Sequence, residues 1–360
     1  MEKYVYSGQL TDNMHDMLLA TKGFEPIDIL TTQLDRDGIT KAIKWKNESV
    51  DSGDIDPETG SPIKKRLCRW IMVDSGAFSV HTGNAHTTLE EYAEYINSIA
   101  DDVDCFAQLD RIPGEFGKPK KAEDYEISAN ESWEAFLKLR SMVKCPEKIL
   151  PVSHFGEDTK YLKRMLEWKD ENGKLLDYIG LSPANDQSKE DRMIYLQNMF
   201  DVIKQSSNPN VKTHIFGFTA MDSLAAFPCY SADSISHRLW GAYNKVLSKN
   251  FGLIFMSKRP RTWRQKSKLS FIETADEYNL NKLKEEIYEY GITPEFAKKF
   301  CKSDRSKYME GFDENNIFDW MSEDNAIRTV FSIRSIQTLT ATKYAYHPNN
   351  RTRSKKLFQI

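Results

Sequence analysis

The sequence contains 360 residues, of which 40% are hydrophobic and 29% are charged, and its formal net charge is −3. This length allows one large barrel domain or two ordinary domains. The nearly balanced charge excludes nucleic-acid binding through overall charge, so any such contact must come from a local basic patch.

Eight short apolar runs follow one another along the chain, and several of them end in Gly, Ser, Asp or His. A nearly continuous apolar run is typical of a parallel strand that is buried on both faces. The predicted strands are Tyr4–Gly8, Asp28–Gln33, Trp70–Gly76, Cys105–Asp110, Lys148–His154, Tyr178–Ser182, Thr213–Thr219 and Cys229–Ser234.

Segments with apolar residues at three- and four-residue spacing separate these runs and predict helices over Leu89–Ile99, Glu131–Val143, Asp191–Gln205 and Leu239–Leu247. Alternating strands and helices indicate an α/β protein with a parallel sheet. Eight such units favour a (β/α)8 barrel of the TIM type. An open doubly wound sheet is the structural alternative, but the chain has no GxGxxG after its first strand.

Two regions depart from this alternation. Residues 34–69 are rich in turn-forming residues and predict a long loop or a hairpin inserted into the barrel. The pattern becomes mainly helical over 276–346. We therefore predict a barrel domain over 1–256, with a basic loop and a C-terminal helical extension over 257–360 that packs on the barrel.

The five cysteines form no CxxC or CxC pair, which argues against a disulfide framework and against a cysteine-rich zinc site. The first residues, MEKYVYSGQLTDN, show neither a basic n-region nor an apolar h-region. No apolar run is long enough to span a bilayer. We expect a soluble cytoplasmic protein with no membrane partner.

Functional side chains stand at the carboxyl ends of four predicted strands, where a barrel places its active site. They are Asp74, Asp110, Asp233 and His154. Each aspartate alone has the alternative role of capping the next helix, and His154 alone has a structural alternative. Burying a carboxylate at a strand end without a polar partner costs free energy, so three such aspartates together indicate a functional site.

Two carboxylates that face one pocket suit displacement at the anomeric carbon of a sugar. One attacks the carbon and the other transfers protons, with the pair about 5 Å apart in a retaining enzyme. The alternative of metal binding lacks a compact ligand motif. We expect no metal and no cofactor.

The residues at these strand ends resemble the tRNA-guanine transglycosylase superfamily over roughly 4–256. The family's Asp-Ser-Gly-Gly-aromatic motif reads Asp74-Ser75-Gly76-Ala77-Phe78 here. Asp233 and Asp110 match the family's aspartates after the eighth and fourth strands. Gly180-Leu181 matches a Gly-Leu pair after the sixth strand, and His154 lies where the family has Gln-Gly-Gly.

The resemblance implies a role for each matched residue. Asp233 would attack C1′ of a guanosine nucleotide, and Asp74 would act as the general acid/base. Phe78 would stack on the base and Asp110 would bind its polar edge. The implied substrate-binding residues are Ser75, Phe78, Asp110, His154, Gly180 and Leu181.

The chain departs from the tRNA enzymes because it lacks their CxCxxC-plus-His zinc site. The segment Asp233-Ser234-Ile235-Ser236-His237-Arg238 is similar to the DNA-acting branch of phages and DNA-modification islands. This implies exchange of guanine in DNA for a free 7-deazaguanine base in a bacterial or phage-infected host cytoplasm, with a homodimer as one possible assembly. A tRNA substrate is the alternative.

A basic segment follows the predicted barrel and reads SKRPRTWRQKSK over 257–268. Clustered cations neutralise phosphates, and a tryptophan can stack on an unpaired base. A solvated basic loop is the alternative. The predicted nucleic-acid-binding residues are Lys258, Arg259, Arg261, Trp263 and Arg264.

Two further functions compete with base exchange in a polymer. One is a nucleoside hydrolase or deoxyribosyltransferase on small substrates, against which the basic, tryptophan-containing loop argues. The other is a binding subunit without catalysis, which would have no use for a nucleophile at Asp233.

Overall fold

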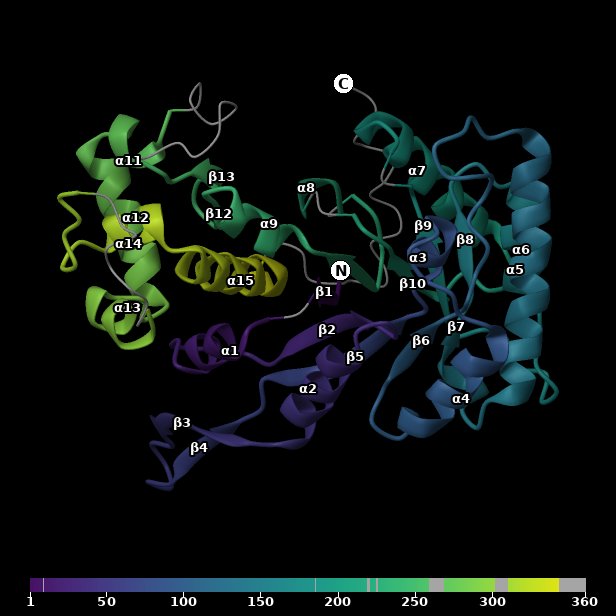
Figure 1. Ribbon diagram of the computed structural model, residues 1–360, viewed down its shortest axis with the longest axis horizontal. Coiled ribbons are helices and arrows are strands. Elements are labelled where there is room, and N and C mark those ends of the chain that lie inside the picture. The colour runs from purple at the N-terminus through teal and green to yellow at the C-terminus, as the bar shows by residue number, and fades with distance from the viewer. Residues whose placement is uncertain are drawn as a thin grey trace.

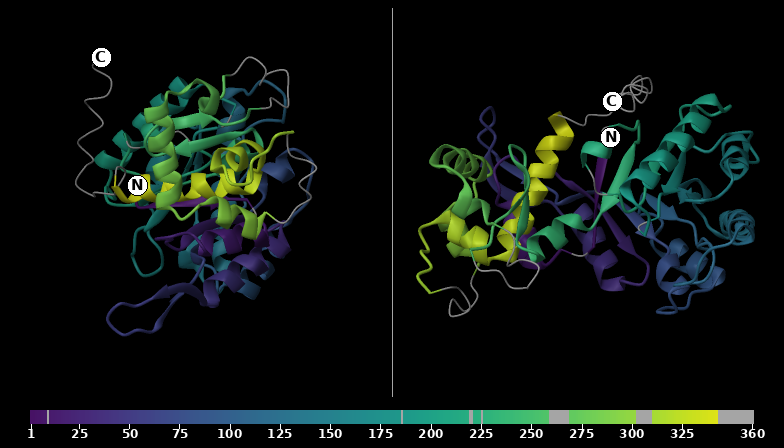
Figure 2. Two further views of the ribbon diagram at one scale, coloured as in Figure 1. Left: turned by 90° about the vertical axis from the view of Figure 1, so that its left-hand side faces the viewer. Right: turned by 90° about the horizontal axis from the view of Figure 1, so that it is seen from above.

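The computed structural model describes residues 1–8, 10–184, 186–218, 221–224, 226–258, 269–301 and 310–342. It shows an α/β protein built on a nearly closed, barrel-like parallel sheet, consistent with a TIM-type barrel (Figure 1). Helices α4 to α7 lie along one side of the sheet, and the C-terminal helices lie at the opposite side (Figure 2).

The sheet has nine strands in the order β7-β6-β5-β2-β1-β11-β10-β9-β8, rather than the predicted eight. The additional strand arises because Pro151 divides the predicted strand over Lys148–His154 into β7, which pairs with β6, and β8, which pairs with β9. Proline lacks the N–H that a sheet needs. The strands are β1 (Lys3–Ser7), β2 (Ile27–Thr32), β5 (Cys68–Asp74), β6 (Cys105–Ala107), β7 (Ile149–Leu150), β8 (Val152–His154), β9 (Tyr178–Ser182), β10 (Lys212–Ile215) and β11 (Ser231–Ser234).

Helices connect these strands, as predicted, although some of them begin or end at other residues than expected. The helix expected over Leu89–Ile99 is confirmed, whereas the one expected over Leu239–Leu247 ends at Ala242, where Asn244 adopts a positive φ of 59° and the chain turns into a strand. The connecting helices are α1 (Asp12–Leu19), α2 (Arg36–Asn47), α3 (Ala77–His81), α4 (Leu89–Ile99), α5 (Ala122–Met142), η1 (Pro146–Lys148), α6 (Thr159–Glu167), α7 (Lys189–Gln205), α8 (Met221–Leu224) and α9 (Ser236–Ala242).

The inserted region after β2 contains helix α2 and an antiparallel hairpin, β3 (Val50–Ile55) with β4 (Pro62–Lys65). The hairpin projects away from the sheet (Figure 1). The turn-rich sequence predicted a long loop or a hairpin, and the structure shows the hairpin. It did not predict α2, which Asp35 caps by accepting from the N–H of Gly38. The helix buries Ile39, Ala42 and Trp45 on one face.

The C-terminal region is mainly helical and packs on the amino-terminal part of the chain. The buried Arg328 side chain donates to the carbonyl oxygen of Gly241 at 2.9 Å, and Arg334 donates to that of Gly23 at 2.6 Å. A hairpin outside the barrel sheet packs with this region and consists of β12 (Lys245–Ser248) and β13 (Gly252–Phe255). The helices of the C-terminal region are α11 (Phe271–Thr274), α12 (Glu277–Glu289), α13 (Pro294–Phe300), α14 (Ile317–Glu323) and α15 (Asn325–Thr342).

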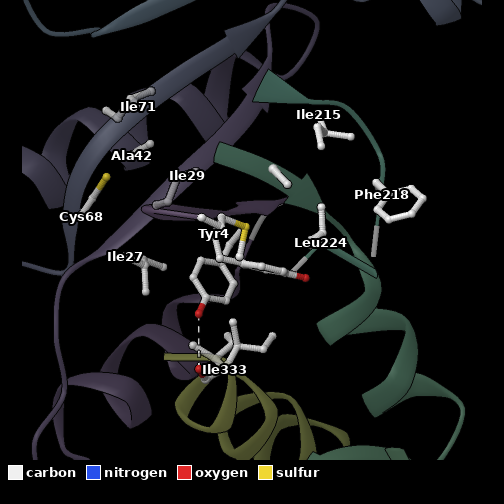
Figure 3. Close-up of a cluster of buried hydrophobic side chains, with 14 of the residues drawn as sticks. Tyr4, Ile27, Ile29, Ala42, Cys68, Ile71, Ile215, Phe218, Leu224 and Ile333 are labelled. Carbon is white, nitrogen blue, oxygen red and sulfur yellow. Dashed lines mark hydrogen bonds between the residues drawn. The ribbon is translucent and has the colours of Figure 1, made fainter. Parts of the chain in front are cut away.

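Two apolar layers hold the fold together. The larger layer joins the outer face of the sheet to the helices, and in Figure 3 it includes Ile29, Ile71, Ile215 and Ile333. The Tyr6 hydroxyl donates a hydrogen bond to the Ile333 carbonyl at 3.3 Å. The smaller layer consists of Val5, Leu30, Met72, Cys105 and Leu150.

Alternation along the strands sets the direction of the functional side chains. Residues two apart in a strand point to the same face. Asp74 therefore points to the same face of the sheet as Met72, and Ser7 to the same face as Val5. Asp74 and Ser7 are each two residues closer to the carboxyl end of their strand. Within the described ranges, no helix is both long and apolar enough to cross a membrane.

Candidate active site at the carboxyl end of the sheet

The three predicted aspartates come together at one end of the sheet. Asp74 ends β5, Asp233 lies in β11, and Asp110 follows β6. All the paired strands are parallel, so their carboxyl ends meet at the same mouth. The charges of Asp110 and Asp233 both act on Asp74, which places the three carboxylates in one electrostatic group.

The surroundings of Asp74 raise the pKa of its carboxyl toward neutral pH. Burial raises the pKa of its carboxyl to about 6, the backbone N–H of Gly76 opposes this shift, and the charges of Asp110 and Asp233 add to it. The Gly76 N–H donates to Asp74 Oδ1 at 2.7 Å. A carboxyl with a pKa near neutrality can both donate and accept a proton, which a general acid/base requires.

The turn after Asp74 depends on glycine. Gly76 has a φ of 77°, and a Cβ there would lie 2.8 Å from Leu34 Cδ1. The turn buries Ser75 and begins α3, on which Phe78 is 64% exposed. Phe78 lies edge-on to Phe116, with the ring centres 6.4 Å apart. An exposed aromatic ring beside the acids can stack on a planar base.

Asp233 is buried and receives three hydrogen bonds. Oδ1 accepts from the Gly217 N–H at 2.8 Å and from His214 Nε2 at 3.2 Å. Oδ2 accepts from the Ser7 hydroxyl at 2.5 Å, its only donor in the described part of the chain. Because a carboxylate oxygen has two lone pairs, Oδ1 is saturated and Oδ2 keeps one lone pair free.

His154 and Asp110 form a buried ion pair, with His154 Nε2 2.5 Å from Asp110 Oδ2. Burial is the largest single influence on His154 and lowers its pKa, but the charge of Asp110, the interaction with its carboxylate and the charge of Glu157 together raise the pKa above its ordinary value. Glu157 supports the pair by accepting from the His154 backbone N–H at 3.0 Å. The structure thus joins two of the predicted substrate-binding residues into one charged unit.

Gly180 and Leu181 lie in β9, and their backbone groups form hydrogen bonds within the sheet. Gly180 N–H donates to the Pro151 carbonyl at 2.7 Å, and the Leu181 carbonyl accepts from Phe216 N–H at 2.9 Å. A Cβ at Gly180 would lie 2.6 Å from Phe216 Cε2. The glycine therefore makes room for the Phe216 ring, a packing role that the sequence prediction did not include.

Two further residues of the sequence analysis are engaged in contacts with other parts of the protein. His237, in the segment that carries the resemblance to the DNA-acting branch, is buried against Tyr6 with ring centres 5.2 Å apart. Burial lowers the pKa of His237 to about 3, so it is neutral. Lys258 Nζ bonds Asp319 Oδ1 at 2.6 Å, so its charge is engaged within the protein. The predicted Arg259, Arg261, Trp263 and Arg264 lie outside the described residues.

No protein-family model matches the chain, and no curated protein matches its sequence. In the parts of the chain that the structure describes, no group of three or more His, Cys, Asp or Glu side chains is arranged to hold a metal ion.

Sequence reasoning did not identify four residues that complete the site. Each contacts a predicted residue through a polar atom, and three of them are buried polar side chains in or just after a strand. A polar residue inside an apolar run was the available signal for Ser7 and His214. Gly217 acts through its backbone, which the sequence does not reveal. The four are Ser7, Glu157, His214 and Gly217.

Proposed function

We propose that the protein is a base-exchanging transglycosylase that replaces guanine in DNA with a 7-deazaguanine base, on a (β/α)8 barrel. The observation that supports this most strongly is the contrast between two carboxyls in one mouth. Asp74 has a pKa raised to about 6, whereas three donors surround Asp233 and leave one lone pair of Oδ2 free. A proton carrier beside a fixed nucleophile is the pair that retaining chemistry at an anomeric carbon requires.

The reaction proceeds in two balanced halves. Asp233 Oδ2 forms a bond to C1′ of the target nucleotide while the bond from C1′ to the guanine nitrogen breaks, and Asp74 supplies the proton that guanine takes away. The incoming base then gives its ring proton to Asp74 and forms the new bond to C1′, and the bonding electron pair returns to Asp233. Asp74 ends protonated, as it began.

The remaining residues of the mouth suit recognition of a planar polar base. Phe78 offers a stacking surface, and the Asp110 carboxylate, oriented by His154, accepts hydrogen bonds from the N–H groups of a guanine-like edge. A base inside a duplex must leave its stack to reach such a pocket. DNA is proposed over tRNA because of the resemblance of the segment after Asp233 and the absence of the zinc motif.

The experiment that tests this function is incubation of the enzyme with radiolabelled guanine and either DNA or tRNA. We expect label to enter DNA, and to enter neither polymer with Asp233→Asn. Label in tRNA alone would support the tRNA enzyme, the second candidate, and would overturn the choice of DNA. Release of free base from small nucleosides without any incorporation would instead support a hydrolase.

A further inference from the structure

A chain of buried polar groups leads from Asp233 into the interior of the sheet. His214, on β10, has no exposed surface, and its Nε2 lies 3.2 Å from Asp233 Oδ1. Its Nδ1 lies 2.6 Å from Ser231 Oγ, and Ser231 Oγ in turn bonds the Tyr178 hydroxyl. The strand register pairs His214 with Ser231, two residues before Asp233 on the same face of β11.

The surroundings of His214 fix its ring in place. The Phe216 ring lies edge-on to the imidazole at a centroid distance of 4.4 Å, and the Tyr178 ring lies edge-on at 6.5 Å. A hydrogen bond at one ring nitrogen decides which tautomer the other presents. When the Ser231 hydroxyl donates a hydrogen bond to Nδ1, the ring proton lies on Nε2, which then donates to the Asp233 carboxylate.

From this geometry we propose that His214 is a positioning residue that promotes release of the sugar from Asp233, the second half of the proposed exchange. The proposal rests on the proposed function, because it concerns the glycosyl-aspartate intermediate. While the ester exists, Oδ1 is a neutral carbonyl oxygen. As the bond from C1′ to Oδ2 breaks, negative charge returns to the carboxylate, and the hydrogen bond from His214 to Oδ1 becomes charge-assisted and stronger.

This role predicts effects of different size on the two halves of the reaction. A donor at Oδ1 stabilises the free carboxylate more than the ester, so its removal slows breakdown of the intermediate. The same removal makes the carboxylate more basic and so does not slow formation by the same factor. A residue that merely supports the fold would lower both rates together.

The test follows formation and decay of the covalent enzyme–DNA adduct separately. The adduct is accumulated on DNA without added base, guanine is then added, and its decay is measured on denaturing gels for the folded protein isolated by gel filtration. With His214→Leu we expect decay to slow on the order of 10²-fold, the effect of losing one donor to a developing oxyanion, and formation to change by less than about tenfold.

Three further variants test whether the effect comes from the hydrogen bond between His214 and Asp233. His214→Gln keeps a donor and should restore decay to within about tenfold of the wild-type rate, since it replaces one hydrogen bond with another. Ser231→Ala removes the partner of Nδ1 and should slow decay by an intermediate factor. Thr213→Val is the matched control, because the adjacent residue on β10 points to the opposite face and its buried side chain is nearly unchanged in shape.

Two results would overturn the proposal, and they are distinguishable from failure of the proposed function. Decay at the wild-type rate in His214→Leu, or formation and decay slowed by one common factor, contradicts the role of His214 while leaving base exchange standing. A wild-type enzyme that forms no adduct and exchanges no base with DNA contradicts the proposed function and this inference with it.

Discussion

The two ends of the barrel-like sheet each hold an aspartate, and their surroundings differ. At the amino end, Asp28 is buried and receives two hydrogen bonds from Arg69, at 3.0 and 2.6 Å, with Lys3 Nζ at 3.7 Å. At the carboxyl end, Asp74 receives a backbone hydrogen bond from Gly76 and faces two further carboxylates. No cation of the described chain forms a salt bridge with Asp74.

This difference separates stability from function within one sheet. A buried carboxylate beside cations keeps its charge at little cost, whereas one beside other carboxylates is destabilised when ionised. We therefore propose that the amino end stabilises the sheet and that the carboxyl end carries the proposed chemistry, which is where TIM-type barrels place their active sites.

The largest expected effect concerns activity at the carboxyl end. Asp74→Asn keeps the size of the side chain but removes proton transfer, so the rate of base exchange should fall on the order of 10²- to 10⁴-fold. Asp28→Asn, the same change at the amino end, should leave the rate per folded molecule within about twofold, because the active site of such a barrel lies at the opposite, carboxyl end of the strands. Label incorporation per folded enzyme checks both. Equal losses in the two variants would contradict the division of roles.

The next effect concerns stability at the amino end. Asp28→Asn leaves Arg69 and Lys3 without their partner and should lower the free energy of unfolding by about 2–3 kcal/mol, less than the 3–5 kcal/mol of a fully buried pair because Arg69 is half-exposed. Urea unfolding monitored by circular dichroism measures this change. No loss of stability would show that the amino end does not hold the barrel.

Asp74→Asn should have the opposite effect on stability. The folded protein raises the pKa of Asp74 to about 6 from an ordinary value of 3.8, so the folded state binds more protons between these values and its stability falls as pH rises. Replacement by Asn should therefore stabilise the protein at pH 7.5 by up to about 3 kcal/mol, since each pKa unit corresponds to about 1.4 kcal/mol, and the gain should vanish below about pH 4. A destabilised variant at pH 7.5 would contradict the raised pKa.

The smallest expected effect concerns the basic segment and tests the polymer partner. Arg259→Ala with Arg264→Ala should weaken DNA binding and reduce the slope of log K against log salt by about two, one for each lost phosphate contact. Lys64→Ala with Lys65→Ala removes the same charge from the β3–β4 hairpin and should leave the slope unchanged. Binding titrations at several salt concentrations decide this, and an unchanged slope in the arginine variant removes the segment from the interface.

The sequence predicted the strands and the three acids because both depend on local pattern. Apolar runs mark buried parallel strands, and an acid at the end of such a run is conspicuous, as at Asp74 and Asp233. Helix α2 was missed because its mainly polar sequence resembles a loop, and the break at Pro151 altered the strand count.

The contacts within the site could not be predicted in the same way. They join residues far apart in the chain, such as Ser7 with Asp233, or they use a backbone N–H, as at Gly217. Strand register decides which side chains meet across a sheet. A single sequence does not specify that register, so His214 remained one polar residue in an apolar run.

In the proposed reaction, Asp233 becomes covalently attached to the sugar while Asp74 only carries protons. The most direct measurement is mass spectrometry of proteolytic peptides from the enzyme–DNA adduct, trapped by rapid denaturation during base exchange. We predict that the deoxyribose is attached to the peptide that contains Asp233, and that Asp74→Asn still permits this attachment at a reduced rate. Attachment to Asp74, or base exchange that proceeds undiminished in Asp233→Asn, would contradict the account.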